Sequence, residues 1–485
     1  MNNISLLASG LVNLINTNAG TLVSNFENVL GTSLEIKVKA SSREIAEIAE
    51  SNVVDYINSL QQKLGANIEG QGLFDYNHSN TAQVVVSDEL NTVMHLFEDW
   101  KNQTNGAIHP NTNLLTEIWS NAEVNQSLPT DSELAEAVMA LNKSPYQLNE
   151  DGSITKLSDV EIKLHSFAKG FVLDKSAEFA LQQEGVSGVV LNLGGDIIAK
   201  GDIIEQVRIT NPLSPEENAN SLGIISLENQ AIASSGNYKQ GFTINGQKFS
   251  HIFNPNTGSP VQEIVHSTVI HENAITAGAL ATAMNILSKE ESRVLADRFD
   301  QSAYLLIDQE NNFTHSENWS VIPESSASTI SFVNVKEKVW NPNLILQINL
   351  ELADLGGYAR RPYVAIWVED ENHKPIRRIA VWYRKPRWLP DLREFSSSLR
   401  EVDMDVSAIT SATRSAGQYS LVWDGKNDAG EFVAQGNYTV FIEAAREHGS
   451  YQLIKQAIKC DDKTKNVSMP GNEEISFSSL ILKMK

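Results

Sequence analysis

The pattern of apolar and polar positions divides the chain into two regions. Between about residues 28 and 320, short apolar runs alternate with segments of helical period. The segment 34–40 (LEIKVKA) alternates as a strand does. The segment 42–64 has a helical period behind a cap at Ser41 or Ser42, and its expected buried stripe is Ile45, Ile48, Val53, Val54, Ile57 and Leu60. This region is therefore predicted to mix helices with strands.

Two more segments of the first region have clear boundaries. The segment 87–104 opens with an S-x-E pattern typical of a capped helix and stops at Asn105-Gly106. The segment 168–185 is predicted to be an amphipathic helix that ends at Gly185, and it leads into a buried strand, a Gly-Gly turn and a second strand over 188–201. Repeated βαβ units are absent, which favours an α+β fold with antiparallel strands. No G-x-G-x-x-G or G-x-x-x-x-G-K-[ST] motif occurs, so nothing indicates a Rossmann or P-loop nucleotide site.

The pattern changes after a short polar linker, predicted at 323–330. From 331 to 485 the chain consists of alternating runs separated by turn residues, namely SFVNVKEKVW, LILQINLEL, YVAIWVED, RRIAVWYRK, YSLVWDG, YTVFIEAARE and ISFSSLILKMK. About seven such strands predict an all-β, Ig-like sandwich domain. We interpret Trp367, Trp382 and Trp423 as packing residues of this sandwich. The basic stretch 374–388 is interpreted as a solvated strand edge, with a docking face as the alternative.

Residues 1–27 are expected to form an extension ahead of the first domain, which spans 28–322. The extension is mildly apolar and has no Lys or Arg before its apolar run, so a short amphipathic helix is favoured over a poor signal peptide. No apolar run approaches the roughly 18 residues of a membrane span. We therefore expect no integral membrane segment.

Net charge and cysteine content exclude some classes of partner and some kinds of site. The formal net charge of −22 repels phosphate backbones, so nucleic acid is not expected to be a partner. A small phosphorylated ligand remains compatible with this charge if local cations or a metal offset it. Cys460 is the single cysteine, which excludes an intrachain disulfide and a cysteine-based zinc site.

The candidate chemistry lies in small-residue turns of the first region. The stretch SHIFNPNTGSP (250–260) breaks the backbone twice, and it is compatible with an ordinary turn or with a rigid loop that presents His251, Asn254 and Thr257 to a ligand. Gly-Gly-Asp at 194–196 allows close approach to the backbone beside a carboxylate. Ser-Ser-Gly at 234–236 offers hydroxyl and N–H groups suited to phosphate oxygens. No H-x-x-x-H or G-x-S-x-G motif accompanies them.

Taken in order, these turns resemble the motifs of the ApbE family, the FAD:protein FMN transferases. The resemblance covers about residues 28–320. The matching segments are 30–32 (LGT), 106–110 (GAIHP), 168–174 (AKGFVLD), 192–196 (NLGGD), 234–238 (SSGNY), 251–258 (HIFNPNTG) and 277–283 (AGALATA). The second region is similar to a domain of unknown function often fused behind ApbE modules, and its segment 423–447 is similar to the Ig-like part of flagellar hook-capping proteins.

The resemblance implies an activity and assigns roles. Members split FAD, attach FMN through a phosphoester to a Thr or Ser of a target protein, and release AMP. By position, His251 is the general base, which suits a side chain that titrates near neutral pH. Ser166 and Thr282 fall where Mg²⁺ is held. The positions that contact FAD are Leu30, Thr32, Ala107, Ile108, His109, Lys163, Lys169, Gly194, Gly195, Asp196, Ser235, Thr257 and Gly258.

Four positions depart from the family pattern. The family has Asp where this chain has His109, Lys163, Asn254 and Gly278. Because Mg²⁺ prefers carboxylate oxygens, the loss at Gly278 predicts weak metal binding. His109 and Lys163 could partly supply positive charge near the phosphates instead.

Three functional interpretations therefore stay open. The chain is an FMN transferase acting on a partner protein, or a degenerate member that binds flavin or a protein without transfer. The third is a hydrolase that splits FAD into FMN and AMP and needs the same metal. The segment TSAT (410–413), with Asp405 upstream, faintly resembles an acceptor sequence and raises self-modification at Thr413. The family resemblance also predicts a periplasmic or otherwise exported protein.

Overall fold

The structure is a computed structural model of the 485-residue chain. It describes residues 21–209, 211–212, 221–236, 241–321, 338–355, 361–383, 386–399, 410–411, 413–447 and 449–484. The first 20 residues and the predicted linker at 323–330 lie outside the described residues. The domain boundary at this linker therefore stays a prediction.

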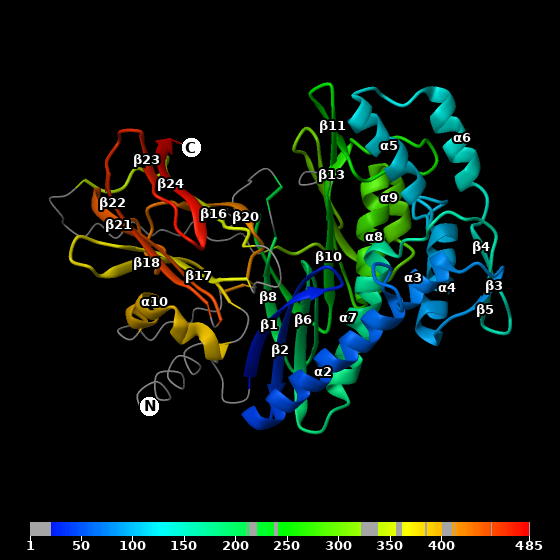
Figure 1. Ribbon diagram of the computed structural model, residues 1–485, viewed down its shortest axis with the longest axis horizontal. Helices are drawn as coiled ribbons and strands as arrows, with labels where there is room; N and C mark the ends of the chain where they lie inside the picture. The colour runs from blue at the N-terminus through cyan, green and yellow to red at the C-terminus, as the bar shows by residue number, and fades with distance from the viewer. Residues whose placement is uncertain are drawn as a thin grey trace.

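An eight-stranded sheet forms the centre of the N-terminal unit (Figure 1). Its strands are all paired antiparallel. In spatial order they are β1 (Thr21–Val29), β2 (Thr32–Ala40), β6 (Val186–Leu193), β7 (Asp196–Gly201), β10 (Ala231–Gly236), β13 (Ile264–His271), β14 (Ala303–Asp308) and β15 (Phe313–His315). The predicted α+β class with antiparallel strands is confirmed.

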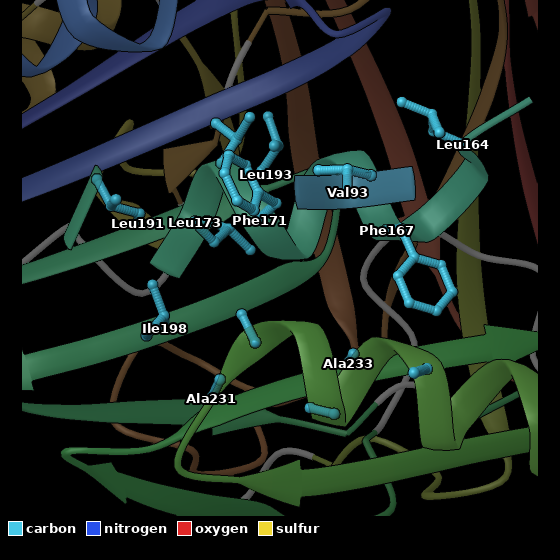
Figure 2. Packing of buried hydrophobic residues seen from close by; sticks show 14 of the residues in the cluster. Val93, Leu164, Phe167, Phe171, Leu173, Leu191, Leu193, Ile198, Ala231 and Ala233 are labelled. Atoms are coloured by element: carbon cyan, nitrogen blue, oxygen red, sulfur yellow. The ribbon is translucent and has the colours of Figure 1, made fainter. Parts of the chain in front are cut away.

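Helices cover one face of this sheet. The helices of the unit are α2 (Arg43–Leu64), α3 (Gly72–His78), α4 (Asp88–Gln103), α5 (Asn113–Asn125), α6 (Asp131–Leu141), α7 (His165–Leu181), α8 (Ala274–Ile286) and α9 (Lys289–Ala296). Figure 2 shows Phe171 and Leu173 of α7 packed near Leu191 and Leu193 of β6. The opposite face packs against the hairpin of β8 (Ile204–Arg208) and β9 (Ile224–Glu228), through Val190 and Leu227 among others.

Local signals in the sequence explain several helix ends. The Ser42 hydroxyl accepts a hydrogen bond from the backbone N–H of Ile45, and the Ser87 hydroxyl accepts one from Leu90, as expected for helix caps. Asn105 and Gly106 follow α4 with positive φ angles of 49° and 80°. The α2 prediction was wrong at Ile48, whose side chain is 56% exposed, because the buried face of α2 runs through Val53, Ile57 and Leu60.

Two smaller structures extend from the sheet. Strands β3 (Gln83–Val85), β4 (Tyr146–Leu148) and β5 (Ser153–Lys156) form a three-stranded sheet in the order β3-β5-β4. Helices α5 and α6 pack against the hairpin of β11 (Gly241–Ile244) and β12 (Gln247–Ser250). This second cluster leads directly into the loop 250–260.

The C-terminal unit is a sandwich of two sheets around one core. A four-stranded sheet has the order β20-β16-β24-β23, and a five-stranded sheet has the order β19-β18-β17-β21-β22. Their bounds are β16 (Leu344–Leu352), β17 (Tyr363–Glu369), β18 (Pro375–Trp382), β19 (Thr410–Ser411), β20 (Gly417–Trp423), β21 (Gly436–Ala445), β22 (Tyr451–Cys460), β23 (Lys465–Met469) and β24 (Ile475–Met484). The pairs are antiparallel except β18 with β19. Trp382 and Trp423 lie in the shared core, as predicted.

The outer face of the five-stranded sheet is covered as well. The 3₁₀ segment η1 (Pro386–Asp391) and the short helix α10 (Arg393–Ser398) pack Leu389 and Phe395 against Trp367. These helical turns were not predicted from the sequence pattern. The prediction of a solvated strand edge for the basic stretch was wrong for Arg378, because its side chain is buried and lies 2.5 Å from Asp428.

Residues 21–27 are the part of the expected N-terminal extension that the structure describes. Residues 21–29 form β1, which pairs with β2 at the edge of the central sheet, so residues 21–27 belong to this sheet. The short helix expected in the apolar stretch 1–20 lies outside the described residues. Leu22 and Phe26 are buried in the main core, and this burial accounts for the apolar character of the segment. No helix among the described residues is long and apolar enough to cross a membrane.

Candidate active site

The loop 250–260 is closed by its own hydrogen bonds. The Asn254 carbonyl accepts from the N–H groups of Thr257 (3.1 Å) and Gly258 (2.8 Å), and the Asn254 N–H donates to the Ser259 carbonyl at 2.9 Å. Phe253 pairs with Pro260, and the Ser250 hydroxyl accepts from the Ile252 N–H at 2.9 Å. His251 stands, partly buried, at the base of this loop. The loop is therefore the compact, turn-rich structure that could present a side chain to a ligand.

The first Gly-rich turn meets the turn between β1 and β2. Gly194 has φ of +65°, and a Cβ at this position would lie 2.5 Å from Oγ1 of Thr32. The Gly194 N–H donates to the Ser33 carbonyl at 2.9 Å. Leu30 precedes Thr32 in the same turn, and its N–H donates to Gln61 on α2 at 3.1 Å. Glycine is therefore required at 194 both for backbone conformation and for this close approach.

Asp196, which follows the Gly-Gly turn, has an unusual electrostatic environment. Burial raises the pKa of its carboxyl to about 6, while the charge of Lys169 and a hydrogen bond from the Ser234 N–H act to lower the pKa. Lys169 projects from α7 and Ser234 lies on β10, so three elements meet at this carboxylate. The carboxylate and the ammonium group provide paired charges beside exposed backbone at Gly195.

Helices α7 and α8 approach each other closely. A Cβ on Gly170 would lie 2.7 Å from the Cα of Ile275, so the small residue in A-K-G permits this contact. Asp174 accepts hydrogen bonds from the N–H groups of Ala274 (2.7 Å) and Ile275 (3.0 Å) and so caps α8. The predicted metal residues lie on these two helices, Ser166 in the first turn of α7 and Thr282 on α8.

Ser235 is held from behind by α8. Its carbonyl accepts a hydrogen bond from the Asn285 amide at 2.8 Å, and Asn285 also donates to the Ser267 hydroxyl at 2.7 Å. Asn285 is 2% exposed. Ser-Ser-Gly, expected as a turn, is the end of strand β10 and is thus fixed to the helix that carries Thr282.

The other predicted turn follows α4. Ala107, Ile108 and His109 are buried, whereas Lys163 is exposed and its N–H donates to the Pro110 carbonyl at 3.4 Å. Burial, aided by the charge of Lys101, lowers the pKa of His109 to about 4. His109 lines a cavity of about 310 Å³ together with Lys101, Asn142 and Asn256.

These contacts join the predicted residues into two groups. Thr32, Gly194, Asp196, Lys169 and Ser235 form one group around the ends of the central strands. The second group joins the 105–110 turn to the loop 250–260, because the Asn256 amide donates to the Asn105 carbonyl at 3.3 Å. The segment 163–169 belongs to both groups, through Lys163 on one side and Lys169 on the other.

The donors at the predicted metal position fit Mg²⁺ poorly. Thr282 donates its hydroxyl hydrogen to the Gly278 carbonyl at 2.9 Å, and Gly278 itself contributes no carboxylate. Among the residues that the structure describes, no group of three or more His, Cys, Asp or Glu side chains could hold a metal ion. Hydroxyl and carbonyl oxygens alone are a weak set for a hard divalent cation.

Sequence reasoning missed three residues that support the candidate site. Asp174 was noted only as part of a motif, and Asn285 and Trp119 were not singled out. Trp119 donates from Nε1 to the Gly258 carbonyl at 3.0 Å. Trp119 lies on the mixed polar and apolar helix α5, and no local sequence pattern marks its contact with Gly258.

The idea of self-modification at Thr413 is not supported. The Thr413 side chain is 2% exposed. A hydroxyl that is enclosed in this way cannot reach a flavin phosphate without local unfolding. The burial of Thr413 therefore corrects its interpretation as an acceptor.

Comparisons with known proteins agree with the division into two units. Residues 30–306 match the ApbE family. Residues 346–476 match a family described as "Predicted periplasmic protein (DUF2271)".

Curated relatives share the N-terminal unit. An FAD:protein FMN transferase of Haemophilus influenzae is 33% identical over 221 residues, which is 43% of this chain and 63% of the relative. One from Vibrio cholerae is 26% identical over 244 residues, which is 49% of this chain and 72% of the relative. The chain thus spans less than two thirds of the Haemophilus relative.

Solved structures share the fold. The crystal structure of the ApbE protein from Thermotoga maritima superposes with a TM-score of 0.54 at 22% identity, covering 61% of this chain and 97% of that one. The flavin transferase ApbE from Vibrio cholerae gives a TM-score of 0.50 at 21% identity, covering 62% and 97%. At these identities the likeness establishes the fold of the N-terminal unit.

Proposed function

The chain belongs to the ApbE family, and from this we propose that its N-terminal unit is an FAD:protein FMN transferase. One observation carries the proposal. The turns at which the chain resembles the family are joined to one another in space, through Thr32 and Gly194, through Lys169 and Asp196, and through Asn105 and Asn256. Separate turns of ordinary loops would have no reason to converge.

The proposed reaction transfers a phosphoryl group. A hydroxyl oxygen of a Thr or Ser on the target protein attacks the FMN phosphorus, the bond from phosphorus to the bridging pyrophosphate oxygen breaks, and AMP leaves. His251 takes the hydroxyl proton as general base. Lys169 and the exposed backbone at Gly194 and Gly195 would lie against the phosphates, where positive charge and N–H donors oppose the charge that builds up.

We infer weak binding of Mg²⁺. The family resemblance places Ser166 and Thr282 where Mg²⁺ would be held. A bound Mg²⁺ would neutralise charge on the phosphates. The residues present fit the ion poorly, since Gly278 replaces the carboxylate, and we derive no step that depends on it. Lys163 and Lys169 are the candidates for partial compensation. The expectation that His109 supplies positive charge was wrong, because burial lowers its pKa to about 4 and keeps the imidazole neutral at neutral pH.

The C-terminal unit suggests where the protein acts. Its match to a family described as periplasmic supports a periplasmic or exported location. We propose that this Ig-like sandwich assists contact with the target protein. The names of the curated relatives favour transfer over the degenerate alternative of flavin binding without transfer.

The test is an assay with FAD and a peptide that bears the family acceptor motif. We expect AMP release together with a flavin-labelled peptide, and no labelling of a matched peptide in which Val replaces the acceptor Thr. His251→Ala should bind FAD and release little AMP. A titration of Mg²⁺ in the same assay should give only a shallow dependence of FAD affinity.

Each outcome has a clear meaning. FAD binding without AMP release in the unaltered protein would favour the degenerate alternative. An affinity for FAD that rises steeply with Mg²⁺ would contradict the weak metal site while leaving the transfer reaction intact.

A further inference from the structure

Trp119, on helix α5, makes three separate contacts with the segment that carries His251. Its indole packs on the ring of Phe249, two residues before His251, with a centroid distance of 5.2 Å. It also packs near the ring of Phe253, two residues after His251, at 6.3 Å. The indole Nε1 donates to the Gly258 carbonyl at 3.0 Å. One side chain therefore contacts residues on both sides of the candidate base.

Hydrogen bonds within the loop connect the residues that Trp119 contacts to the backbone at His251. The peptide of Gly258 accepts from Trp119 through its carbonyl, and the Gly258 N–H donates to the Asn254 carbonyl at 2.8 Å. The Val261 N–H donates to the Ile252 carbonyl at 2.9 Å, which closes the base of the loop next to His251. A loop cross-linked in this way moves as one piece, so fixing Gly258 and Phe253 also fixes the backbone at His251.

Helix α5 is a firm support for the indole. Trp119 is 5% exposed, and it lies in a cluster with Leu115, Leu141 and Phe242. The far end of α5 is fastened to the β11–β12 hairpin, because the Gln126 side chain donates to the Thr243 carbonyl (3.0 Å) and accepts from the Asn245 N–H (2.8 Å). The hairpin leads directly into His251. Helix α5 therefore contacts the loop through Trp119 and the hairpin before the loop through Gln126.

We propose that Trp119 is a positioning residue that holds His251 in place for proton abstraction from the acceptor hydroxyl. The inference rests on the proposed function, in which His251 is the base. A general base must lie within hydrogen-bond reach of the proton that it takes, and an error of about 1 Å can lower a rate by about a hundredfold. The indole N–H sets this geometry without touching FAD or the acceptor.

The central variant is Trp119→Phe, which keeps an aromatic ring against Phe249 and Phe253 but removes the N–H. We expect kcat for FMN transfer to fall at least about tenfold, while the KM and the dissociation constant for FAD change less than about twofold. In a His251→Ala background the same substitution should change the residual rate less than about twofold, because no base remains to be positioned. A role in general stability would lower both backgrounds equally.

A second readout does not depend on transfer. The imidazole proton signal of His251, identified by its loss in His251→Ala, should shift or broaden in Trp119→Phe, while the signal of exposed His373 stays unchanged. If the unaltered protein releases no AMP, the proposed function fails, and the spectrum still tests whether Trp119 fixes His251. If Trp119→Phe does not fold, Phe249→Leu removes one ring contact and should show the same pattern.

Two results would overturn the inference. One is a kcat of Trp119→Phe within about twofold of the unaltered enzyme together with an unchanged His251 signal. The other is an equal loss of rate from Trp119→Phe with and without His251, which would show that the two residues act independently.

Discussion

At the scale of single residues, burial decides the charge of the candidate site more than residue type does. His109 replaces an acidic residue of the family pattern, yet burial lowers its pKa to about 4 and keeps the imidazole neutral at neutral pH. Asp196 shows the opposite case, because burial raises the pKa of its carboxyl to about 6. The charge of a buried side chain at neutral pH can therefore be smaller than its residue type suggests.

His109 should make stability depend on pH. Its folded-state pKa is lower than the ordinary value of 6.5, so the unfolded chain binds the proton more readily between pH 6.5 and 4. Stability contributed by the neutral imidazole is present above pH 6.5 and is lost as pH falls through this window. Between pH 7.5 and 5 we expect the free energy of unfolding to fall by about 2 kcal/mol from this residue alone.

Urea titrations at pH 7.5 and 5 measure this effect. His109→Gln should remove about 2 kcal/mol of the difference between the two pH values, whatever it does to absolute stability. The control is His95→Gln, because His95 is exposed on α4, the helix that precedes the His109 turn, and it should leave the difference unchanged. An identical pH dependence in His109→Gln and the unaltered protein would refute the assignment.

At the scale of elements, the sequence predicts what is local and misses what depends on packing. The caps at Ser42 and Ser87 and the strands around Gly194 follow from residues a few positions apart. The motif order likewise indicated which turns form the candidate site. Trp119 and Gly258 are 139 positions apart, and no local pattern marks their contact. The turns at 386–399 were missed for a similar reason, since they form against the sheet face that carries Trp367.

Asp174 is a cap supplied by another helix. The residue before α8, Asn273, makes no side-chain cap, and the carboxylate of Asp174 on α7 accepts from the first two N–H groups of α8 instead. Asp174→Ala should lower the free energy of unfolding by about 2 kcal/mol, because both N–H groups lose their partner in a partly buried place. It should also weaken FAD binding, since α8 carries Thr282 and holds Ser235 through Asn285.

Ser288→Ala is the matched control, because Ser288 caps the neighbouring helix α9 with an exposed hydroxyl. It should cost about 1 kcal/mol of stability and leave FAD affinity unchanged. Urea unfolding and FAD titration of both variants distinguish a cap that only stabilises from one that also orders the site. Equal FAD affinities in the two variants would contradict the role given to Asp174.

At the scale of the whole molecule, the two units have separate cores. The cluster around the central sheet includes Phe171 and Leu191, and the cluster of the sandwich includes Trp340 and Cys460, with no residue in common. This division was visible in the sequence as a change of period near the linker. It implies that damage to the sandwich core should leave the candidate active site intact.

Gly425 gives a specific test of this independence. It has φ of +78°, and a Cβ at this position would lie 2.0 Å from the indole of buried Trp340. Gly425→Ala should therefore destabilise the sandwich by about 3 kcal/mol or more, from backbone strain and from overpacking. Gly430→Ala is the matched control, since Gly430 has φ of +82° but nothing within 4 Å of the added Cβ, and it should show the strain alone.

Cys460 reports on the sandwich core directly. Its thiol is fully buried, and burial raises its pKa to about 12, so a thiol reagent should label it only when the core opens. We expect labelling to be much faster in Gly425→Ala than in Gly430→Ala. FAD affinity should be equal in both, because the candidate active site is built on the other core. A parallel loss of FAD binding in Gly425→Ala would show instead that the two units fold as one, and the sandwich would then be a structural part of the site.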